Sequence, residues 1–262
     1  MRKVSVWLMS AVVVLSLLAP LRAADDQWRQ LRSTHVIVYY KNAPEQFIER
    51  VKERAEDYYD KIADDLGFTR YKFWLWDNRA SIYIFDNMQD FQAQTNQPSW
   101  SAGAVKIREK IIYTYPDERG FFETILPHEM GHIIFREFVG PHNNAIPVWL
   151  DEGVASYQEA AKRAMTDSII RDALKKGTLV SVERLMSVNP QFLQDTQQVN
   201  LFYAQALGLI SFLIREFGKD NFVFFCQELR DKKDFSRALS YAFGFKNIQE
   251  FDRAWQRYLS HE

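Results

Sequence analysis

The chain has 262 residues, of which 47% are hydrophobic and 26% charged, with 33 basic and 34 acidic side chains. This composition is typical of a soluble globular protein of one or two domains, and it excludes wholesale disorder, a collagen-like repeat and a multi-span membrane protein. Because there is no basic excess, a nucleic-acid partner is not expected. The single cysteine, Cys226, excludes an internal disulfide framework and a cysteine-built zinc site, and its apolar neighbours predict a core position.

The first 23 residues have the three-part pattern of a secretory signal peptide. Arg2 and Lys3 precede the uncharged apolar run 4–18, and a small residue, Ala23, stands at the cleavage position. An uncleaved membrane anchor is the alternative, but the run is shorter than the roughly 20 residues that a spanning helix needs. We therefore predict cleavage after Ala23, a periplasmic or secreted location, and no stable membrane insertion of the mature protein.

Residues 24–120 are predicted to form a small β-sheet lobe with one packed helix. Stretches rich in β-branched and aromatic residues predict strands at 34–40 and 81–85, and one or two more within 103–115. An apolar stripe predicts a helix at 44–66 that ends at Gly67. Asp86 is expected to cap a short helix that runs to residue 94.

Residues 121–262 are predicted to be almost continuously helical, with breaks at Gly140-Pro141 and Asn189-Pro190. The expected helices are 121–138, 149–164, 166–176, 200–217, 219–230, 234–242 and 247–260. The whole of 24–262 is therefore expected to be one α+β domain with two lobes. Within the first lobe, the aromatic cluster Tyr71, Phe73, Trp74 and Trp76 is expected to pack in the core, with a binding face as the alternative.

The pattern His-Glu-x-x-His at residues 128–132 carries the chemistry. On a helix, residues four positions apart lie on one face with Cβ atoms about 5–6 Å apart, so His128 and His132 can bind one zinc ion. Glu129 is rotated by roughly 100° from His128 and can instead reach a water molecule on the open side of the metal. This division of roles is typical of a zinc hydrolase rather than of a structural zinc site.

A catalytic zinc site needs a third protein ligand and keeps a fourth position open. Glu152 follows His132 after 19 intervening residues, on a second predicted helix that Pro147 opens. The alternative is a solvated acid near a helix N-terminus, where the helix dipole favours a negative charge. Apolar residues on both sides of Glu152 argue against a fully solvated face. We therefore predict one catalytic Zn²⁺ held by His128, His132 and Glu152.

Two segments resemble a known family. Leu126-Pro-His-Glu-Met-Gly-His132 and Trp149-Leu-Asp-Glu-Gly-Val-Ala-Ser-Tyr157 resemble the gluzincin metallopeptidases, and among these most of all the bacterial peptidase MA-like domain proteins. The second segment is also similar to that of the M1 aminopeptidases. Flanking similarities, at 98–104, 110–114 and Tyr203-Ala-Gln-Ala-Leu-Gly208, extend the resemblance over most of 33–218.

The resemblance implies a zincin-like, two-lobed fold, the zinc ligands already named, and Glu129 as the general base that activates a zinc-bound water. It also implies a phenol that hydrogen-bonds the oxyanion. Tyr203 is the candidate, Tyr157 is the alternative, and a core role for either is equally open. The M1 enzymes carry a Gly-x-Met-Glu-Asn motif that grips the substrate amino terminus. The nearest glycine stretch here, 101–105, has no Glu, which favours an endopeptidase.

Two functions remain open at this point. One is an exported zinc endopeptidase that acts on a peptide or protein substrate, and the other is a metallopeptidase-fold binding or scaffolding module at the cell envelope. The presence of Glu129 favours the enzyme, because a binding module has no chemical need for a general base. A substrate is expected to pair with an exposed strand edge at 110–114, with Ile111, Ile112 and Tyr113 as its binding residues.

Overall fold

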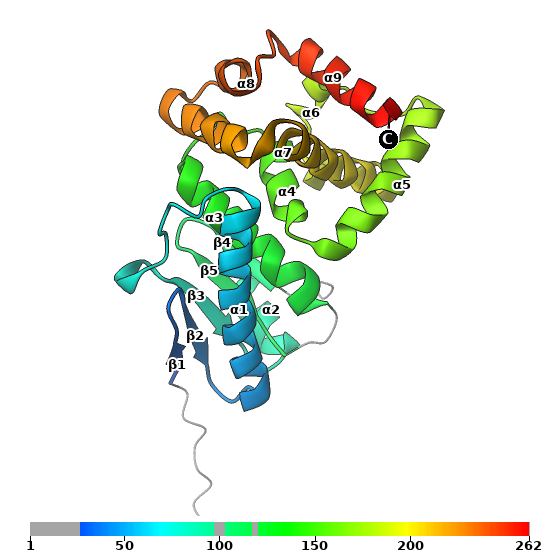
Figure 1. Ribbon diagram of the computed structural model, residues 1–262. Coiled ribbons are helices and arrows are strands. Elements are labelled where there is room, and N and C mark those ends of the chain that lie inside the picture. The colour runs from blue at the N-terminus through cyan, green and yellow to red at the C-terminus, as the bar shows by residue number, and fades with distance from the viewer. Residues whose placement is uncertain (1–26, 97–102, 117–119, 262) are drawn as a thin grey trace, which may run out of the picture.

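The computed structural model describes residues 27–96, 103–116 and 120–261. The proposed signal peptide lies outside these ranges, so export stays a prediction. The described chain is α+β, as predicted: a small N-terminal sheet is followed by a larger helical region (Figure 1).

Five strands form one sheet in the order β1-β2-β3-β5-β4. The central strands β2, β3 and β5 are mutually parallel, and β1 and β4 are antiparallel to their neighbours. The strands are β1 (Arg29–Arg32), β2 (Val36–Tyr40), β3 (Ala80–Ile84), β4 (Gly103–Lys106) and β5 (Ile111–Thr114). Strand β1 escaped the sequence analysis because its four residues, Arg-Gln-Leu-Arg, carry almost none of the apolar and β-branched signal of a strand.

The sheet has one buried and one outward face. Alternate residues, among them Val38, Ile82 and Ile112, are fully buried on the inner face. Helix α1 (Glu45–Asp65) covers this face, and its buried side chains recur with helical spacing, as the sequence predicted (Figure 1). The outward face carries tyrosines and is flanked at one end by α2 (Met88–Thr95). Helix α2 is capped by Asn87 rather than by the predicted Asp86, because the Asp86 carboxylate instead accepts hydrogen bonds from Asn42.

The helical region follows the predicted order with shifted boundaries. Its main helices are α3 (Leu126–Val139), α4 (Val148–Tyr157), α5 (Ala160–Lys176), α7 (Thr196–Lys232), α8 (Phe235–Phe243) and α9 (Ile248–His261). Short turns, which the sequence analysis did not anticipate, lie at η1 (Trp76–Asn78), α6 (Val182–Leu185) and η3 (Pro190–Phe192). The two helices predicted at 200–217 and 219–230 are both present within α7 and meet at a kink at Gly218, which has a non-helical backbone, as the predicted division implies.

The helix predicted at 121–138 begins with a different kind of turn. Residues Phe121–Ile125 form a π-helical turn, in which the Leu126 N–H donates to the carbonyl of Phe121, before α3 starts. Pro127 has no N–H and so cannot take part in a regular helical ladder at this point. The wider turn accommodates this proline one residue before His128, and single π-turns are frequent at functional sites.

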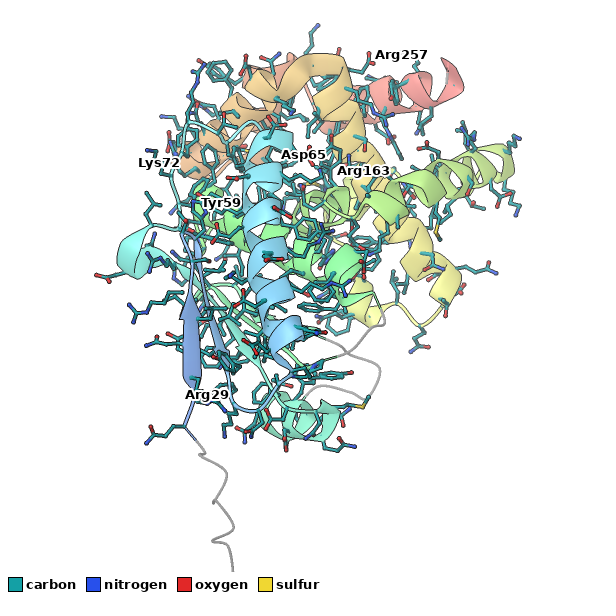
Figure 2. The ribbon with its side chains drawn as sticks, turned by 60° about the horizontal axis from the view of Figure 1, so that its bottom comes forward. Arg29, Tyr59, Asp65, Lys72, Arg163 and Arg257 are labelled. Carbon is teal, nitrogen blue, oxygen red and sulfur yellow. The ribbon has the colours of Figure 1, made fainter. Side chains whose placement is uncertain are left out.

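Contacts between helices join the two lobes. The carboxylate of Asp65, at the end of α1, lies 3.6 Å from the Arg163 guanidinium of α5, and Asp64 lies 3.0 Å from Lys219 of α7 (Figure 2). One cluster of buried apolar residues runs from β2 through α1, α3, α4 and α7 to α9. In the part of the chain that the structure describes, α7 alone is long and apolar enough to cross a membrane. However, 67% of its most apolar stretch is buried inside the protein, as in a central core helix.

Several predictions about single residues can be compared with this core. Cys226 is fully buried, as predicted. Trp74 is also fully buried, and Tyr71 and Phe73 pack against the same core, so the aromatic cluster is structural where its side chains are described.

Candidate metal centre

The two motif helices cross closely because glycines stand at the contacts. A Cβ atom at Gly131 of α3 would lie 3.1 Å from the Cα of Ala155 on α4. A Cβ atom at Gly153 of α4 would lie only 2.5 Å from the backbone oxygen of Ala206 on α7. Each glycine is a direct neighbour of a motif residue, His132 or Glu152. Because glycine has no side chain, the helices can pack closely at these two positions, and this brings the functional side chains together.

The three predicted zinc ligands meet at this crossing. The Nε2 atoms of His128 and His132 lie 3.2 Å apart, and the Glu152 Oε2 atom lies 3.6 Å and 3.7 Å from them. One ligand atom from each residue of this trio lies within 4.8 Å of the other two, and it is the one such cluster among the described residues. His132 is nearly inaccessible, whereas His128 and Glu152 are half-buried and open to one side.

Two buried carboxylates hold the opposite nitrogen of each imidazole. Glu159 Oε1 lies 2.7 Å from Nδ1 of His128, and Asp151 Oδ1 lies 3.0 Å from Nδ1 of His132. A carboxylate at Nδ1 accepts the proton there and leaves a lone pair on Nε2. Both Nε2 atoms face Glu152, and with a metal bound between them their lone pairs would point at it, as in the carboxylate–histidine–metal arrangement of metal sites.

A break between helices α4 and α5 positions Glu159 against His128. One continuous helix was predicted over 149–164, but α4 ends at Tyr157 and Glu159 has an extended backbone (φ −88°, ψ 98°) before α5 begins. In a continuous helix, Glu159 would lie seven residues, about two turns, beyond Glu152 along the axis. The break instead turns its carboxylate back to His128, and the side chain is 1% exposed.

Basic side chains compensate the charge of these carboxylates. Arg136 Nε donates to Asp151 Oδ2 at 2.8 Å, and Lys162 Nζ donates to Glu159 Oε1 at 2.6 Å. Buried carboxylates are strongly disfavoured without such partners. The outer partners of both imidazoles are therefore fixed from behind, which limits how far the rings can turn.

The electrostatics show how strongly these groups interact. Burial by itself raises the pKa of Glu152, but hydrogen bonds from His128 and His132 outweigh burial and hold that pKa far below its usual range. Burial by itself lowers the pKa of His132, yet the charge and hydrogen bonding of Asp151, together with Glu152, raise it well above its usual value. The cluster therefore favours a positive charge between the imidazoles and the carboxylate.

The donor set fits a zinc ion. Two ligands that each lie about 2.1 Å from a tetrahedral ion lie about 3.4 Å apart, which is close to the 3.2–3.7 Å separations found here. Two imidazole nitrogens and one carboxylate are the ligands of the His₂Glu catalytic class. In that assignment His128, His132 and Glu152 hold the metal, and a fourth position stays available.

Glu129 lies beside the cluster and outside it. Its carboxylate is half-buried and forms no hydrogen bond or ion pair with a described residue, although its charge contributes to the raised pKa of His128. Because Glu129 directly follows His128 in α3, its side chain lies beside the cluster, and it is not committed to another described residue.

The two candidate tyrosines differ sharply in their surroundings. Tyr203 of α7 is half-buried, and burial followed by the charges of Glu152, Glu129 and Glu159 raises its pKa to about 12. Its hydroxyl has no hydrogen-bond partner among the described residues. Tyr157 is buried under the Arg163 guanidinium, which lies 4.7 Å from its ring centre, and is influenced by Arg163 and Asp65 instead. Tyr203 is the tyrosine that faces the cluster.

The expected substrate strand is not at the sheet edge. Strand β5 pairs with β3 on one side and β4 on the other, and Ile112 is fully buried. The prediction that 110–114 presents an exposed edge, with Ile111, Ile112 and Tyr113 at the substrate, is therefore wrong. In the described part of the sheet the outer strand on this side is β4, which packs beside the turn that leads into α3.

Sequence reasoning missed Asp151 and Glu159. Asp151 carried one usable signal, since an acid directly before the ligand Glu152 sits among apolar residues of a buried helix. Glu159 carried none, because no Pro or Gly marks the break that turns it inward. His142, in contrast, lies exposed in the loop between α3 and α4.

Comparisons with known proteins agree with this site. A search of the curated proteins finds no match. The family model described as the peptidase MA superfamily matches residues 72–261, which include β3 to β5 of the sheet, both motif helices and nearly all of the helical region. The fold is therefore metallopeptidase-like, and the chain belongs to the peptidase MA superfamily.

Proposed function

We propose that this protein is a zinc-dependent peptidase of the gluzincin type. The observation that carries the proposal is the convergence of His128 Nε2, His132 Nε2 and Glu152 Oε2 on one point, with each imidazole held from behind by a buried carboxylate. A surface cluster of histidines and acids has no reason to fix ring orientation in this way. Such fixation is typical of a built metal site.

A zinc ion in this site would polarise the scissile carbonyl and acidify a water molecule. Glu129 accepts the proton of the attacking water and later gives it to the leaving amine. Its half-buried and uncommitted carboxylate suits that role, because a base must exchange a proton without first breaking an ion pair.

Tyr203 is the proposed oxyanion donor. Its raised pKa keeps the phenol protonated at neutral pH, so that the hydroxyl can donate a hydrogen bond to a developing negative charge. The Lys162 ammonium lies 5.4 Å from the centre of its ring and also donates to Glu159. This contact holds the ring beside the cluster.

The substrate is proposed to be an extended peptide that pairs with the outer edge of β4. Residues 104–106 of β4 pair in antiparallel register with residues 111–113 of β5, so the other edge of β4 is the one proposed to receive the peptide. Backbone pairing with an edge strand recognises a peptide without much demand on its sequence. Since no acidic group that would grip a substrate amino terminus stands in 101–105, internal bonds are the proposed targets.

Export is a separate proposal, supported by the pattern of the first 23 residues. The mature protein is expected to begin near Ala24. Mass spectrometry of the exported protein tests this, and an intact Met1 in a membrane fraction would replace cleavage with anchoring.

The Glu129→Gln variant tests the catalytic proposal. The substitution keeps the volume of the side chain but removes its ability to accept the proton, so hydrolysis of a peptide library should fall by about 10²–10⁴. Zinc content, measured by elemental analysis, should stay near one ion per chain. The matched control is Glu123→Gln, because Glu123 is an exposed glutamate in the turn before α3 and its carboxylate lies 3.9 Å from Arg50. That variant should keep full activity.

The same experiment separates the enzyme from a binding module. A fully zinc-loaded wild type that cleaves no member of a broad library would favour the binding module. Full hydrolysis by Glu129→Gln would contradict the proposed base even if zinc is present.

A further inference from the structure

The outward face of the sheet carries a row of tyrosines. Tyr39, Tyr83 and Tyr113 are direct partners across β2, β3 and β5. The rings of Tyr39 and Tyr83 are stacked with their centroids 4.5 Å apart, and the centroids of Tyr83 and Tyr113 lie 5.6 Å apart. All three side chains remain half-exposed. A solvent-facing sheet surface normally carries polar residues, and a contiguous row of exposed rings marks a binding face.

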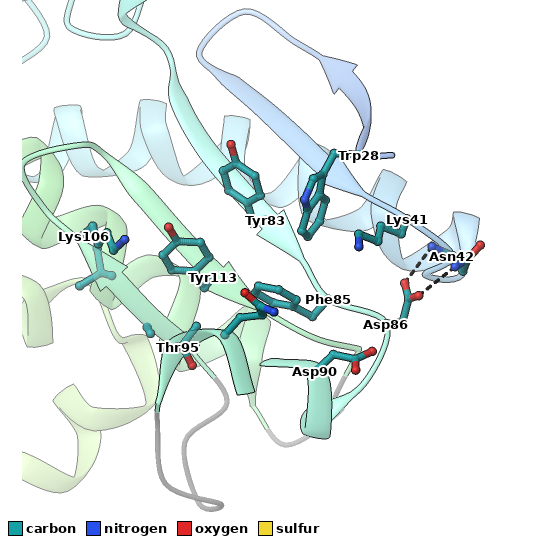
Figure 3. A pocket seen from close by; sticks show the side chains of 13 residues that line it. Trp28, Lys41, Asn42, Tyr83, Phe85, Asp86, Asp90, Thr95, Lys106 and Tyr113 are labelled. Carbon is teal, nitrogen blue, oxygen red and sulfur yellow. Dashed lines mark hydrogen bonds between the residues drawn. The ribbon is translucent and has the colours of Figure 1, made fainter. Parts of the chain in front are cut away.

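The row continues into a pocket. Ala104 of β4, the register partner of Tyr113, lines a pocket of about 700 Å³ together with Tyr83 and Tyr113 (Figure 3). This volume falls within the roughly 300–1,000 Å³ of small-molecule sites. Trp28 forms a further wall, with its ring edge-on to Tyr83 at 5.1 Å and to Phe85 at 5.5 Å.

The rim of the pocket is polar. Asp90, Gln94 and Thr95 line it from α2, Asp86 lines it from the connection between β3 and α2, and Asn42 donates hydrogen bonds to Asp86 (Figure 3). A carboxylate has about four lone-pair sites, so Asp86 keeps acceptor capacity beyond its two bonds to Asn42. The pocket therefore combines flat apolar walls with several planar groups that accept or donate hydrogen bonds.

The charges of the pocket decide what kind of ligand fits. Two lysines and two aspartates line it, so its formal charge is zero. The Lys41 and Lys106 ammonium groups lie 5.4 Å from the ring centres of Trp28 and Tyr113 respectively. A cationic ligand would therefore meet two ammonium groups, and an anionic ligand would meet the Asp86 and Asp90 carboxylates. Because these charges balance, the pocket favours neither sign of charge, and a neutral ligand fits it best.

We propose that this pocket binds a short neutral oligosaccharide. A pyranose ring presents weakly positive C–H groups on its face, which pack on the negative face of an aromatic ring. Its hydroxyls lie around the edge and suit the amide, carboxylate and ammonium groups of the rim. This site lies on the face of the sheet opposite α1, whereas the metal centre lies at the crossing of α3 and α4. The pocket and the metal centre therefore use different side chains, although residues 104–106 of β4 line the pocket and also belong to the strand proposed to pair with a peptide.

The test is titration calorimetry on the zinc-loaded mature protein. The probes are neutral trisaccharides of glucose and of N-acetylglucosamine, a sulfated trisaccharide, a polyamine and a pool of unglycosylated peptides. At least one neutral trisaccharide should bind, and the charged probes should not. Trp28→Ala removes a wall of the pocket and should weaken that binding at least tenfold. Hydrolysis of unglycosylated peptides should not change, because Trp28 touches no part of the metal centre.

Matched controls separate the pocket from the general surface. Gln94 and Gln89 are both exposed on α2, but only Gln94 lines the pocket. Gln94→Ala should weaken saccharide binding several-fold, and Gln89→Ala should leave it unchanged. Tyr241→Ala, which removes a tyrosine that is 70% exposed on α8, should also have no effect.

Three results would overturn the proposal. The first is no binding of any neutral saccharide at millimolar concentration. The second is equal binding by wild type, Trp28→Ala and Gln94→Ala. The third is binding of unglycosylated peptides that Trp28→Ala abolishes, which would make the pocket a peptide site.

Discussion

Among the described residues, two regions hold a histidine with a carboxylate, and only one of them brings together a set of donor atoms that could hold a metal ion. Beside the sheet, Glu56 Oε2 lies 2.6 Å from Nδ1 of His35, much as Glu159 and Asp151 hold His128 and His132. The His35 ring, however, stacks on Tyr59 with centroids 3.7 Å apart and belongs to no metal-ligand cluster in the described part of the chain.

The difference shows what a metal site requires beyond its orienting carboxylates. At His35 the carboxylate joins α1 to the start of β2, since Glu56 also accepts hydrogen bonds from Ser33 and from the His35 backbone. At the α3–α4 crossing the same contact aims two imidazoles at one point. A candidate metal centre therefore differs from a structural ion pair in that the Nε2 atoms of two histidines meet at one point. The close contact of α3 with α4 at Gly131 allows them to meet.

The largest expected effect is the loss of Asp151. Asp151→Ala leaves Arg136 and His132 without their shared partner in a buried position, so the free energy of unfolding should fall by about 3–5 kcal/mol. Urea denaturation measures this. The control is Asp172→Ala on α5, whose pair with Lys176 is well exposed and should contribute at most about 1 kcal/mol. Equal losses in the two variants would contradict the assignment of Asp151 to a buried network.

The second prediction separates the two kinds of histidine–carboxylate pair directly. Glu159→Gln keeps the side-chain volume but weakens the orientation of His128, so zinc affinity should fall by about 10–100-fold. Competition with a chromogenic chelator measures the affinity. Glu56→Gln makes the same chemical change at His35 and should leave zinc affinity unchanged. Similar affinities for Glu159→Gln and wild type would show that the outer carboxylate does not position the ligand.

The third prediction concerns the glycines that bring the ligands together. At Gly153 an added Cβ would meet the backbone oxygen of Ala206 at 2.5 Å, so α4 and α7 must move apart in Gly153→Ala. Overpacking typically costs about 1–3 kcal/mol, and the better helix propensity of alanine offsets up to about 1 kcal/mol. A net loss of about 1–2 kcal/mol should lower the melting temperature by several degrees. Gly131→Ala, where the closest contact is 3.1 Å, should cost less, and the reverse order would contradict this account.

The sequence predicted the residues that carry the chemistry of the site better than the carboxylates that orient them. His128, Glu129, His132 and Glu152 follow from helical spacing and donor type alone, and the structure brings the three ligands together. Glu159 depends on a helix break that has no local cause, since it is the contact with His128 across the fold that fixes the break.

The sheet shows the same limit. Stretches rich in β-branched and aromatic residues correctly indicated β2 and β3, and 103–115 holds two further strands, β4 and β5, where one or two were predicted, because strand propensity is a local property. The order of the strands is not local. The substrate edge was assigned to 110–114 because nothing within those residues indicates that β4 pairs outside them.

The smallest expected effect is the pH dependence of the structural pair at His35. Burial by itself raises the pKa of Glu56, but hydrogen bonds from Ser33 and His35 outweigh it and lower the pKa below its usual 4.5. A lowered carboxyl pKa gives stability that is present above the unfolded pKa and is lost as the pH falls through the folded pKa. Glu56→Gln removes the charged acceptor and should cost about 1 kcal/mol at pH 7, the typical difference between a charged and a neutral hydrogen bond. Urea denaturation from pH 7 to pH 3 should show the wild type and the variant converging below about pH 4.5. A difference that stays constant over this range would mean that the Glu56 charge does not stabilise the junction of α1 with β2.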